Sequence, residues 1–292
     1  MDWKDYQIPV GKVANEVFVW MKTHLSGFFN AMADVIEAII NGFLWLLQGP
    51  DMKALKDTDL WFLPEIYPLF VIAVFVAIAW GLQRSWRICV GVAVGFLFIL
   101  NQGYWDETTE SLTLILSSCA VCMAVGVPIG IACAHNPRLN ATLSPVLDLM
   151  QTLPTFVYLI PAIIFFGIGM VPGLIATVIF VLPAPIRLTE LGVSSTPTPL
   201  IEAATAFGAT PRQRLWKVEL PWAMPQIMVG LNQTIMLSLS MVVISSLVGA
   251  NGLGTPVLRA LASVNAAKGF ESGFVIVVLA IVLRSIFQRE VK

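Results

Sequence analysis

The stretch EAATAFGATPRQRLWKVELP, residues 202–221, is a polar island between two strongly hydrophobic segments. Its opening Glu-Ala-Ala, residues 202–204, favours a helix, and Gly208 permits a turn that residues with side chains resist. Pro211 suits the first turn of a second helix, and Pro221 is expected to end it. The stretch therefore predicts two short helices joined by a hinge.

The composition around this island is that of a membrane protein. Of 292 residues, 57% are hydrophobic and 12% are charged, and the mean hydropathy is +0.82, which is too apolar for an ordinary soluble domain. The formal net charge of −1 leaves no basic excess to neutralise phosphates, so nucleic acid is excluded as a partner. The first residues, MDWKDYQ, lack a positive region, so we expect no cleavable signal peptide.

No catalytic or metal-binding constellation is visible in the sequence, so we expect no metal and no enzyme activity in this chain. His24 and His135 have no neighbours at metal-ligand spacing, and there is no Walker-type loop for ATP. The cysteines lie in or beside apolar segments, where packing is the expected role rather than redox chemistry. They are Cys89, Cys119, Cys122 and Cys133.

Residues 1–60 are interpreted as an extracytoplasmic N-terminal segment. Within it, residues 13–47 form one predicted helix with a continuous polar stripe, which favours a helix that lies in the membrane interface. The alternative is a true span packed against other helices. The stripe consists of Asn30, Asp34, Glu37 and Asn41. Residues 48–60 contain a Gly-Pro pair and several charges, and are predicted to be a linker.

The rest of the chain predicts an all-α polytopic membrane protein with about seven spans, each near the length that a bilayer requires. Two of them fall in residues 61–110, and the remainder form a core over residues 111–292. The spans are predicted at 64–82, 86–104, 111–134, 145–170, 172–190, 223–248 and 272–288. Prolines interrupt several of them, which favours helices that line a pathway over passive anchors. These are Pro128, Pro154, Pro161, Pro183 and Pro185.

The distribution of Lys and Arg predicts the orientation of the chain. If the polar island is cytoplasmic, one set of loops is rich in basic residues and the opposite set, past the first span, holds Arg259, Lys268 and the acidic run WDETTE. We therefore expect the N-terminus outside and the C-terminus in the cytoplasm. Lysines in the N-terminal 60 residues weaken the rule there. The basic residues on the inner side are Arg84, Arg87, Arg138, Arg187, Arg212, Arg214, Lys217, Arg284, Arg289 and Lys292.

Polar and aromatic residues within the spans have two interpretations each. Thr234, Ser238 and Ser245 share one helical face and are candidates to line a translocation route, or to hydrogen-bond between helices. Phe156 and Tyr158 are candidates for weak cation–π contact with a quaternary ammonium in the pathway, or for packing. Residues 126 and 130 form a GxxxG pair, for which close helix packing is the expected role.

The spacing within the polar island is also a family signature. Glu-Ala-Ala is followed after three residues by Gly208, and after nine more by Val218, one residue and Leu-Pro. This pattern resembles the cytoplasmic EAA loop of permease subunits in ABC importers, although the family has Ile where this chain has Val218. The run LDLMQTLPTFVYLIPAIIFFGIGMVPGLIATVIFVLPAPIRLTELG, residues 147–192, and the segment after it look like the permease subunits of glycine betaine/proline betaine importers of the osmoprotectant group.

This resemblance implies a type I ABC importer permease fold in a homodimer, joined by two copies of a cytoplasmic ABC ATPase and by a separate betaine-binding protein outside the cell. ATP and Mg²⁺ would bind the ATPase, and this chain would need no cofactor. The coupling loop would cover residues 193–222. Glu202 would contact the ATPase, and Ala203 and Ala204 would be small enough to fit its groove. Gly208 would set the angle between the helices. The motif ends with Leu220 and Pro221. Arg212 and Arg214 are alternative contacts, or they meet lipid headgroups.

The expected function is import of glycine betaine or related compatible solutes in the inner membrane. The nearest alternative is a permease for choline, carnitine or an amino acid. An ion-coupled transporter would favour acidic residues within the spans, where Asp148 and Glu190 are the candidates, both near span ends. A channel or scaffold would leave the spacing of the polar island unexplained.

Overall fold

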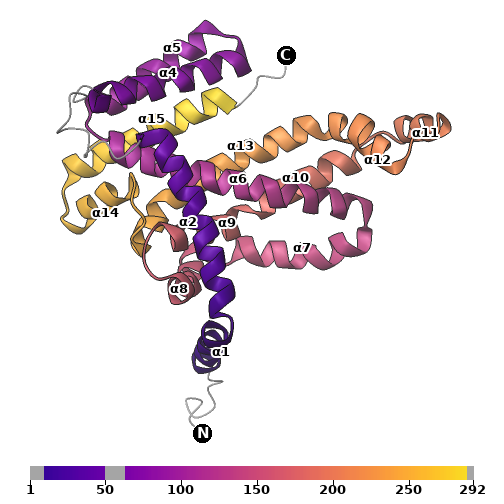
Figure 1. Ribbon diagram of the computed structural model, residues 1–292, viewed down its shortest axis with the longest axis horizontal. Helices are drawn as coiled ribbons and strands as arrows, with labels where there is room; N and C mark the ends of the chain where they lie inside the picture. Colours follow the sequence, from indigo (N-terminus) through magenta and orange to yellow (C-terminus); the bar gives the residue numbers. More distant parts are fainter. Residues whose placement is uncertain (1–9, 50–62, 288–292) are drawn as a thin grey trace.

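A computed structural model describes residues 10–49 and 63–287 of the chain, and within these residues it contains helices and no β-strand. Figure 1 shows them as an elongated bundle. The α-helices are α1 (Val10–His24), α2 (Ser26–Gln48), α4 (Leu63–Gln83), α5 (Trp86–Asn101), α6 (Trp105–His135), α7 (Pro137–Thr152), α8 (Thr155–Phe166), α9 (Met170–Val181), α10 (Pro183–Ser194), α11 (Thr198–Ala206), α12 (Pro211–Arg214), α13 (Leu220–Ser245), α14 (Gly254–Ala262) and α15 (Ala266–Phe287). A π-helix, Leu215–Glu219, and a 3₁₀-helix, Ser246–Val248, flank α13.

The prediction of a polytopic membrane protein with about seven spans is confirmed. In the described residues, six helices are long and apolar enough to cross a membrane, or up to seven if the bent pair α7 and α8 is one span. The predicted span at 86–104 is a shorter helix of 16 residues, α5. Large apolar side chains cover the outside of the bundle, as is expected where lipid replaces water as the solvent. Examples are Phe70, Trp80, Trp86, Val94 and Ile281.

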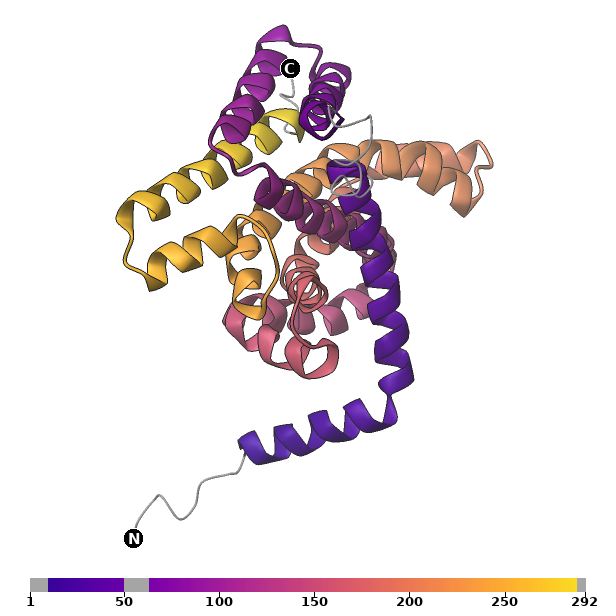
Figure 2. The same cartoon turned by 60° about the vertical axis from the view of Figure 1, so that its left-hand side comes forward.

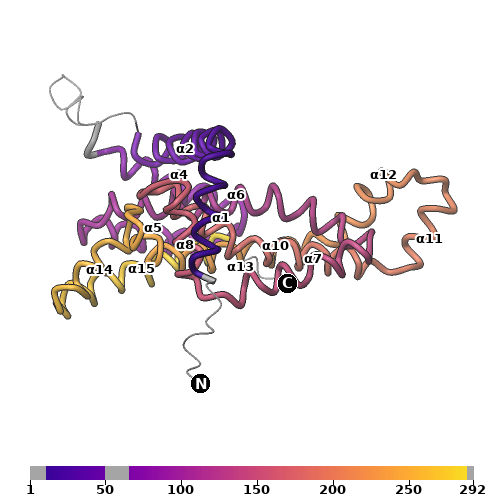
Figure 3. The backbone as a smooth tube through the Cα atoms, turned by 90° about the horizontal axis from the view of Figure 1, so that it is seen from below, coloured from indigo at the N-terminus to yellow at the C-terminus, as the bar shows by residue number. Residues whose placement is uncertain are grey.

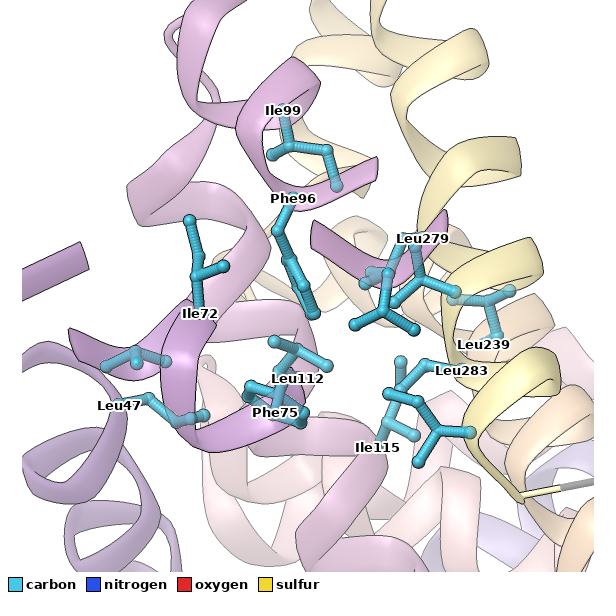
Figure 4. Close-up of a cluster of buried hydrophobic side chains, with 14 of the residues drawn as sticks. Leu47, Ile72, Phe75, Phe96, Ile99, Leu112, Ile115, Leu239, Leu279 and Leu283 are labelled. Carbon is cyan, nitrogen blue, oxygen red and sulfur yellow. The ribbon is translucent and has the colours of Figure 1, made fainter. Parts of the chain in front are cut away.

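The largest buried cluster joins α4, α5, α6, α13 and α15 (Figure 4). Phe96 of α5, Leu112 of α6 and Leu279 of α15 are fully buried there, and Phe96 contacts the ring of Phe75 from α4 at 5.0 Å between centroids. Cys89 and Cys119 belong to the same cluster, and all four cysteines are free and buried, as the packing interpretation predicts. The early helices α4 and α5 are therefore bound to the core by side chains far away in the sequence.

Helix α10 packs on α6 and on α13 more extensively than any other two elements pack in the described part of the chain, and α6 also packs on α13. The GxxxG pair of α6 lies against α10, and packing is confirmed as its role. A Cβ atom at Gly126 would lie 2.9 Å from the Pro185 side chain, and one at Gly130 would lie 2.6 Å from the Ile186 carbonyl oxygen. Gly192 of α10 approaches α13 in the same way. The backbones meet this closely because these positions carry no side chain.

The predicted span at 145–170 corresponds to two helices, α7 and α8, which count as one span only if the bent pair is taken together. Helices α7 and α8 are bent by 96° across the break between them. Leu153 and Pro154 both have extended backbone angles, with ψ of 137° and 132°. A residue before proline is driven out of the helical region, so the chain turns here although hydropathy continues through the break. By contrast, Pro128 and Pro161 lie inside continuous helices.

The prediction of one continuous helix at 13–47 is wrong, because the chain breaks at Leu25 into α1 and α2. The two run in different directions, and α1 projects from the body (Figure 2). The polar stripe of α2 is exposed, as predicted, while Ile40 on its other face is buried against α6 and α9. Helix α2 is long enough to span, but it runs crosswise to α6 and α13 (Figure 1). Its location in the interface remains a prediction, and most of the linker at 48–60 lies outside the described residues.

We predict that Gly130→Ala destabilises the bundle by about 1–3 kcal/mol, the usual cost of overpacking a close contact. The added methyl group would meet a backbone carbonyl of α10, which cannot move aside as a flexible side chain can. Thermal unfolding of the purified protein in detergent measures the effect. Gly91→Ala in α5 is the matched control, since nothing lies within 4 Å of its Cβ position. Equal melting temperatures for the two variants would contradict the prediction.

Candidate functional site

The polar island forms a loop that projects from one end of the bundle, between α10 and α13 (Figure 3). We call residues 195–219, with α11, α12 and the π-helix, the docking loop. Figures 1 and 3 place α14 at the opposite end of the molecule. Helix α11 has no buried residue, and in α12 none is buried either. Two helical elements with no contribution to the core are available for contact with another molecule.

The predicted hinge between two helices is confirmed. Gly208 has a φ of +79°, a left-handed conformation that side-chain-bearing residues rarely adopt. Its N–H donates to the Thr205 carbonyl at 2.9 Å, and the N–H of Ala209 donates to the Ala204 carbonyl at 3.0 Å. These bonds satisfy carbonyls at the end of α11, as in a glycine-terminated helix. Open space surrounds the Cβ position of Gly208, so crowding does not require a glycine here. The left-handed backbone conformation does.

A capping box starts the second helix of the docking loop. The Thr210 hydroxyl accepts from the Gln213 N–H at 3.3 Å, and the Gln213 side chain accepts from the Thr210 N–H at 2.9 Å. Pro211 occupies the first turn, as predicted. Both free N–H groups are satisfied locally, so the start of this helix is defined by its own residues.

The prediction that Pro221 ends this helix is wrong, because the chain continues through it into α13. The π-helix precedes it, and the Leu220 N–H donates to Leu215, five residues back. This wider turn shifts the hydrogen-bond ladder, so that Pro221 falls in the first turn of α13. A missing N–H is tolerated there, since the first turn needs no donor at that position.

The outer surface of the docking loop presents several apolar side chains and the charges of Glu202, Arg212 and Lys217. Glu202 and Ala203 are exposed, and Ala204 is half-buried. In the part of the chain that the structure describes, Glu202 has no ion pair. Phe207 at the hinge is 93% exposed and Trp216 is 63% exposed. An unpaired carboxylate beside exposed aromatic rings is typical of a protein–protein contact, in which aromatic anchors carry much of the binding energy.

The base of the docking loop contains a buried carboxylate that the sequence analysis missed. Glu219 is 3% exposed, and it lies 2.8 Å from Arg214 Nε and 2.8 Å from His135 Nε2. Glu219 occupies the variable position between Val218 and Leu-Pro, and its close partner His135 is 84 residues away. The short spacing between Arg214 and Glu219 could have indicated an ion pair between them. Nothing in the sequence pairs Glu219 with His135.

The hydroxyl residues considered for a pathway are buried and hydrogen-bonded in this structure. Ser238 receives a bond of 2.8 Å from Ser118 of α6, while Ser245 lies 3.3 Å from Thr177 of α9. Thr234 donates to the Gly230 carbonyl in its own helix. The structure thus contains the interhelical bonds of the packing interpretation for Ser238 and Ser245. A role in lining a route remains a prediction.

The two aromatic candidates of α8 differ in exposure. Phe156 is 56% exposed, whereas Tyr158 is 7% exposed and donates its hydroxyl to the Met150 carbonyl of α7. Tyr158 therefore packs across the bend between α7 and α8. Within the described residues, no group of His, Cys, Asp and Glu is arranged to hold a metal ion.

The opposite end of the bundle has a polar pocket of about 440 Å³ between the start of α6, α14 and α15. Carboxylates of Glu107 and Glu271 and the cations Arg259 and Lys268 line it, together with Tyr104. Burial, and then the Glu271 carboxylate, raise the pKa of the Tyr104 hydroxyl above its ordinary value. A pocket lined by both carboxylates and cations therefore distinguishes this end of the molecule from the docking-loop end.

Comparison with known proteins identifies relatives over most of the chain. A family model for binding-protein-dependent transport system inner membrane components matches residues 126–289. The glycine betaine/carnitine transport permease protein GbuB of Listeria monocytogenes is 43% identical and covers 91% of this chain and 90% of that protein. The glycine betaine transport system permease protein OpuAB of Bacillus subtilis is 42% identical over 97% of this chain and 94% of its own length.

Two further comparisons agree with these. The glycine betaine/proline betaine permease protein ProW of Escherichia coli is 42% identical and covers 96% of this chain and 75% of that protein. Among solved structures, an inward-facing conformation of the MetNI methionine ABC transporter matches with a TM-score of 0.54 and 25% identity. That match covers 60% of this chain and 89% of the other, so the fold is that of an ABC importer permease.

Proposed function

Because the chain belongs to the family of binding-protein-dependent transport system inner membrane components, we propose that it is the translocation subunit of an ATP-driven importer of glycine betaine, proline betaine and similar compatible solutes. It is a multi-pass membrane protein. The observation that carries the proposal is the docking loop, which has the spacing of an ATPase-contacting loop and stands free of the bundle. The substrate is inferred from the names of three relatives with 42–43% identity.

In this proposal, a cytoplasmic ABC ATPase receives α11 in a surface groove. Glu202 supplies a charged hydrogen bond, and Ala203 and Ala204 let the helix seat closely. The exposed Phe207 and Trp216 add apolar contact beside them. ATP and Mg²⁺ bind the ATPase, and the permease transmits its closure to the spans. This chain would bind the ATPase, change conformation when the ATPase closes, and keep other solutes from crossing the membrane.

The complete transporter is proposed to contain two copies of this chain, two ATPase subunits and an extracytoplasmic binding protein that delivers the solute. Pulling two docking loops together would move two bundles against each other, which is how a symmetric pair turns closure into alternating access. The lipid bilayer surrounds the exposed apolar side chains of the bundle.

The proposed orientation has the docking loop and C-terminus in the cytoplasm and the N-terminus outside. Basic residues support it, since Arg138, Arg212, Arg214 and Lys217 all lie at the docking-loop end of the helices. The acidic start of α6 and the α14–α15 turn, which holds Val264, would then face the outside.

Uptake of labelled glycine betaine tests the proposal as a whole. In cells without osmolyte importers, we expect uptake to require this chain, its ATPase, its binding protein and ATP. Carnitine, choline and amino acids are measured in parallel, because GbuB is named for carnitine as well. Assembly of the complex without betaine uptake, but with uptake of one of these, would retain the importer and reject the substrate.

Glu202→Lys is predicted to weaken the association between this chain and the ATPase. Losing a hydrogen bond to a charged group costs about 1.5–3 kcal/mol, so binding falls about tenfold to a hundredfold. Uptake falls with it, while insertion into the membrane is unchanged. Co-purification and uptake measure the two effects. Glu16→Lys, an exposed charge reversal on α1, is the control. Normal co-purification of Glu202→Lys would remove this residue from the interface.

Gly208→Val is predicted to disrupt the hinge without removing any contact. A β-branched residue at a φ of +79° is strained by about 1–3 kcal/mol, so α11 changes its angle to α12. We expect ATP-driven uptake to be lost although the protein inserts normally. Gly27→Val serves as a control, because that glycine has open space and no positive φ. Full uptake by Gly208→Val would show that the angle is not important.

Cysteine labelling tests the orientation. Single cysteines replace Val264, which is 90% exposed, or Phe207, which is 93% exposed. An impermeant thiol reagent added to whole cells is expected to label the cysteine at position 264 and to spare the one at 207. The native cysteines are buried, which keeps the background low. The reverse labelling pattern would invert the proposed topology.

A further inference from the structure

The buried carboxylate of Glu219 connects the docking loop to a helix that is distant in the sequence. One of its oxygens accepts from Arg214 Nε at 2.8 Å, and the other lies 2.8 Å from Nε2 of His135, the last residue of α6. Arg214 ends α12, and Glu219 ends the π-helix. We call these three residues the charge clamp. It ties the second half of the docking loop to the end of α6.

Both ring nitrogens of His135 face oxygen atoms of other residues. Nδ1 lies 2.8 Å from the Ile131 carbonyl oxygen, which can only accept, and Nε2 faces a carboxylate, which also accepts when ionised. The Glu219 carboxylate lies between the Arg214 guanidinium and the His135 ring, and these contacts compensate for its removal from water.

The π-helix explains why Arg214 and Glu219 meet at a separation of five residues. In an α-helix, residues three and four apart are neighbours, and residues five apart diverge. The i→i+5 bond from Leu220 to Leu215 widens this turn and places the two side chains together. A single π-turn is an unusual feature that recurs at functional sites. Here it brings together Arg214 and Glu219, two of the three residues of the charge clamp.

An apolar cluster adjoins the charge clamp. Ala223 and Ile227 of α13 pack against Val193 of α10, with Ile131 and Ala134 of α6 at the edge. Ile131 also accepts the hydrogen bond from His135. The end of α6 is therefore held both by charge and by packing, and a displacement of the π-helix cannot occur without straining the contact to α6.

We propose that Glu219 is a positioning residue that transmits movement of the docking loop to α6. This rests on the proposed function, since it assumes that an ATPase moves the loop. Glu219 is buried, so it acts through Arg214 and His135 rather than by touching the ATPase. Breaking the charge clamp should leave the exposed face of α11 intact, and should separate ATP hydrolysis from transport.

The test uses Glu219→Gln in the complete complex with ATPase and binding protein. Glutamine keeps the size and loses the charge, so Arg214 and His135 lose their carboxylate partner. We expect the complex to assemble and to hydrolyse ATP, while solute imported per ATP hydrolysed falls about tenfold, given the large cost of breaking a buried charge pair. Asp148→Asn is the matched control, because it breaks the exposed Arg187–Asp148 pair, in which both side chains are largely in solvent.

Arg214→Gln is a second variant, which keeps the test valid if Glu219→Gln does not fold. Arg214 is 30% exposed, and its replacement leaves the Glu219 carboxylate in contact with His135. The double variant, Arg214→Gln with Glu219→Gln, is expected to be no worse than Glu219→Gln alone, since the two residues act through one contact. An additive loss would overturn the idea that they form a single clamp.

Spin labels at Lys217 and Val125 give a measure that does not depend on which solute is carried. Both positions are exposed, one in the π-helix and one in α6. When ATP is added, we expect the distribution of distances between the two labels to stay unchanged in the wild type and to broaden in Glu219→Gln.

Three results would overturn the proposal. They are a normal transport ratio in Glu219→Gln, an unchanged spin-label distance in that variant, or uptake and hydrolysis that fall together with the amount of assembled complex. The last result would mean a purely structural anchor. If the wild-type complex imports no solute, the proposed function fails, and the spin-label distances still decide whether the clamp moves with the loop.

Discussion

The close packing of α6, α10 and α13 is the constraint on which the rest of the structure depends. In a bilayer, apolar helices gain little from leaving lipid for one another, so association requires contact at short range. Gly126 and Gly130 allow it between α6 and α10, and Gly192 allows it between α10 and α13. The docking loop leaves this group along α10 and returns along α13. Its two ends are therefore held at a fixed separation by glycine contacts.

The docking loop combines an unattached outer face with a strongly attached base. Helix α11 buries nothing and leaves Glu202 without an ion pair among the described residues, so its surface is available to a partner. The base is fixed by the capping box of Thr210 and by the Glu219 carboxylate. A partner that pulls on α11 would consequently act on α13 and α6, rather than unfold a flexible linker.

Features that depend on neighbouring residues could be predicted from the sequence, and those that depend on distant partners could not. The hinge at Gly208, the first turn at Pro211 and the exposed stripe of α2 follow from local chemistry. Pro154 predicted an interruption of its span, but the bend of 96° could not be predicted, because hydropathy is continuous across Leu153 and Pro154. The pairing of Glu219 with His135 was missed because 84 residues separate them, and no spacing rule connects the ends of α6 and the π-helix.

Polar contacts in the middle of the bundle differ in strength from those at the docking-loop end. Between the spans, neutral hydroxyls meet, as in the Ser118–Ser238 and Thr177–Ser245 pairs, and such bonds contribute about 0.6 kcal/mol each in membranes. At the end of α6, the buried Glu219 carboxylate contacts the partly exposed side chains of Arg214 and His135, and a hydrogen bond to a charged group contributes about 1.5–3 kcal/mol. Helices joined by weak neutral bonds can exchange partners during a transport cycle. The stronger charged contact resists separation where force would enter the bundle. This difference in stiffness allows the spans to rearrange while the docking loop stays joined to α6.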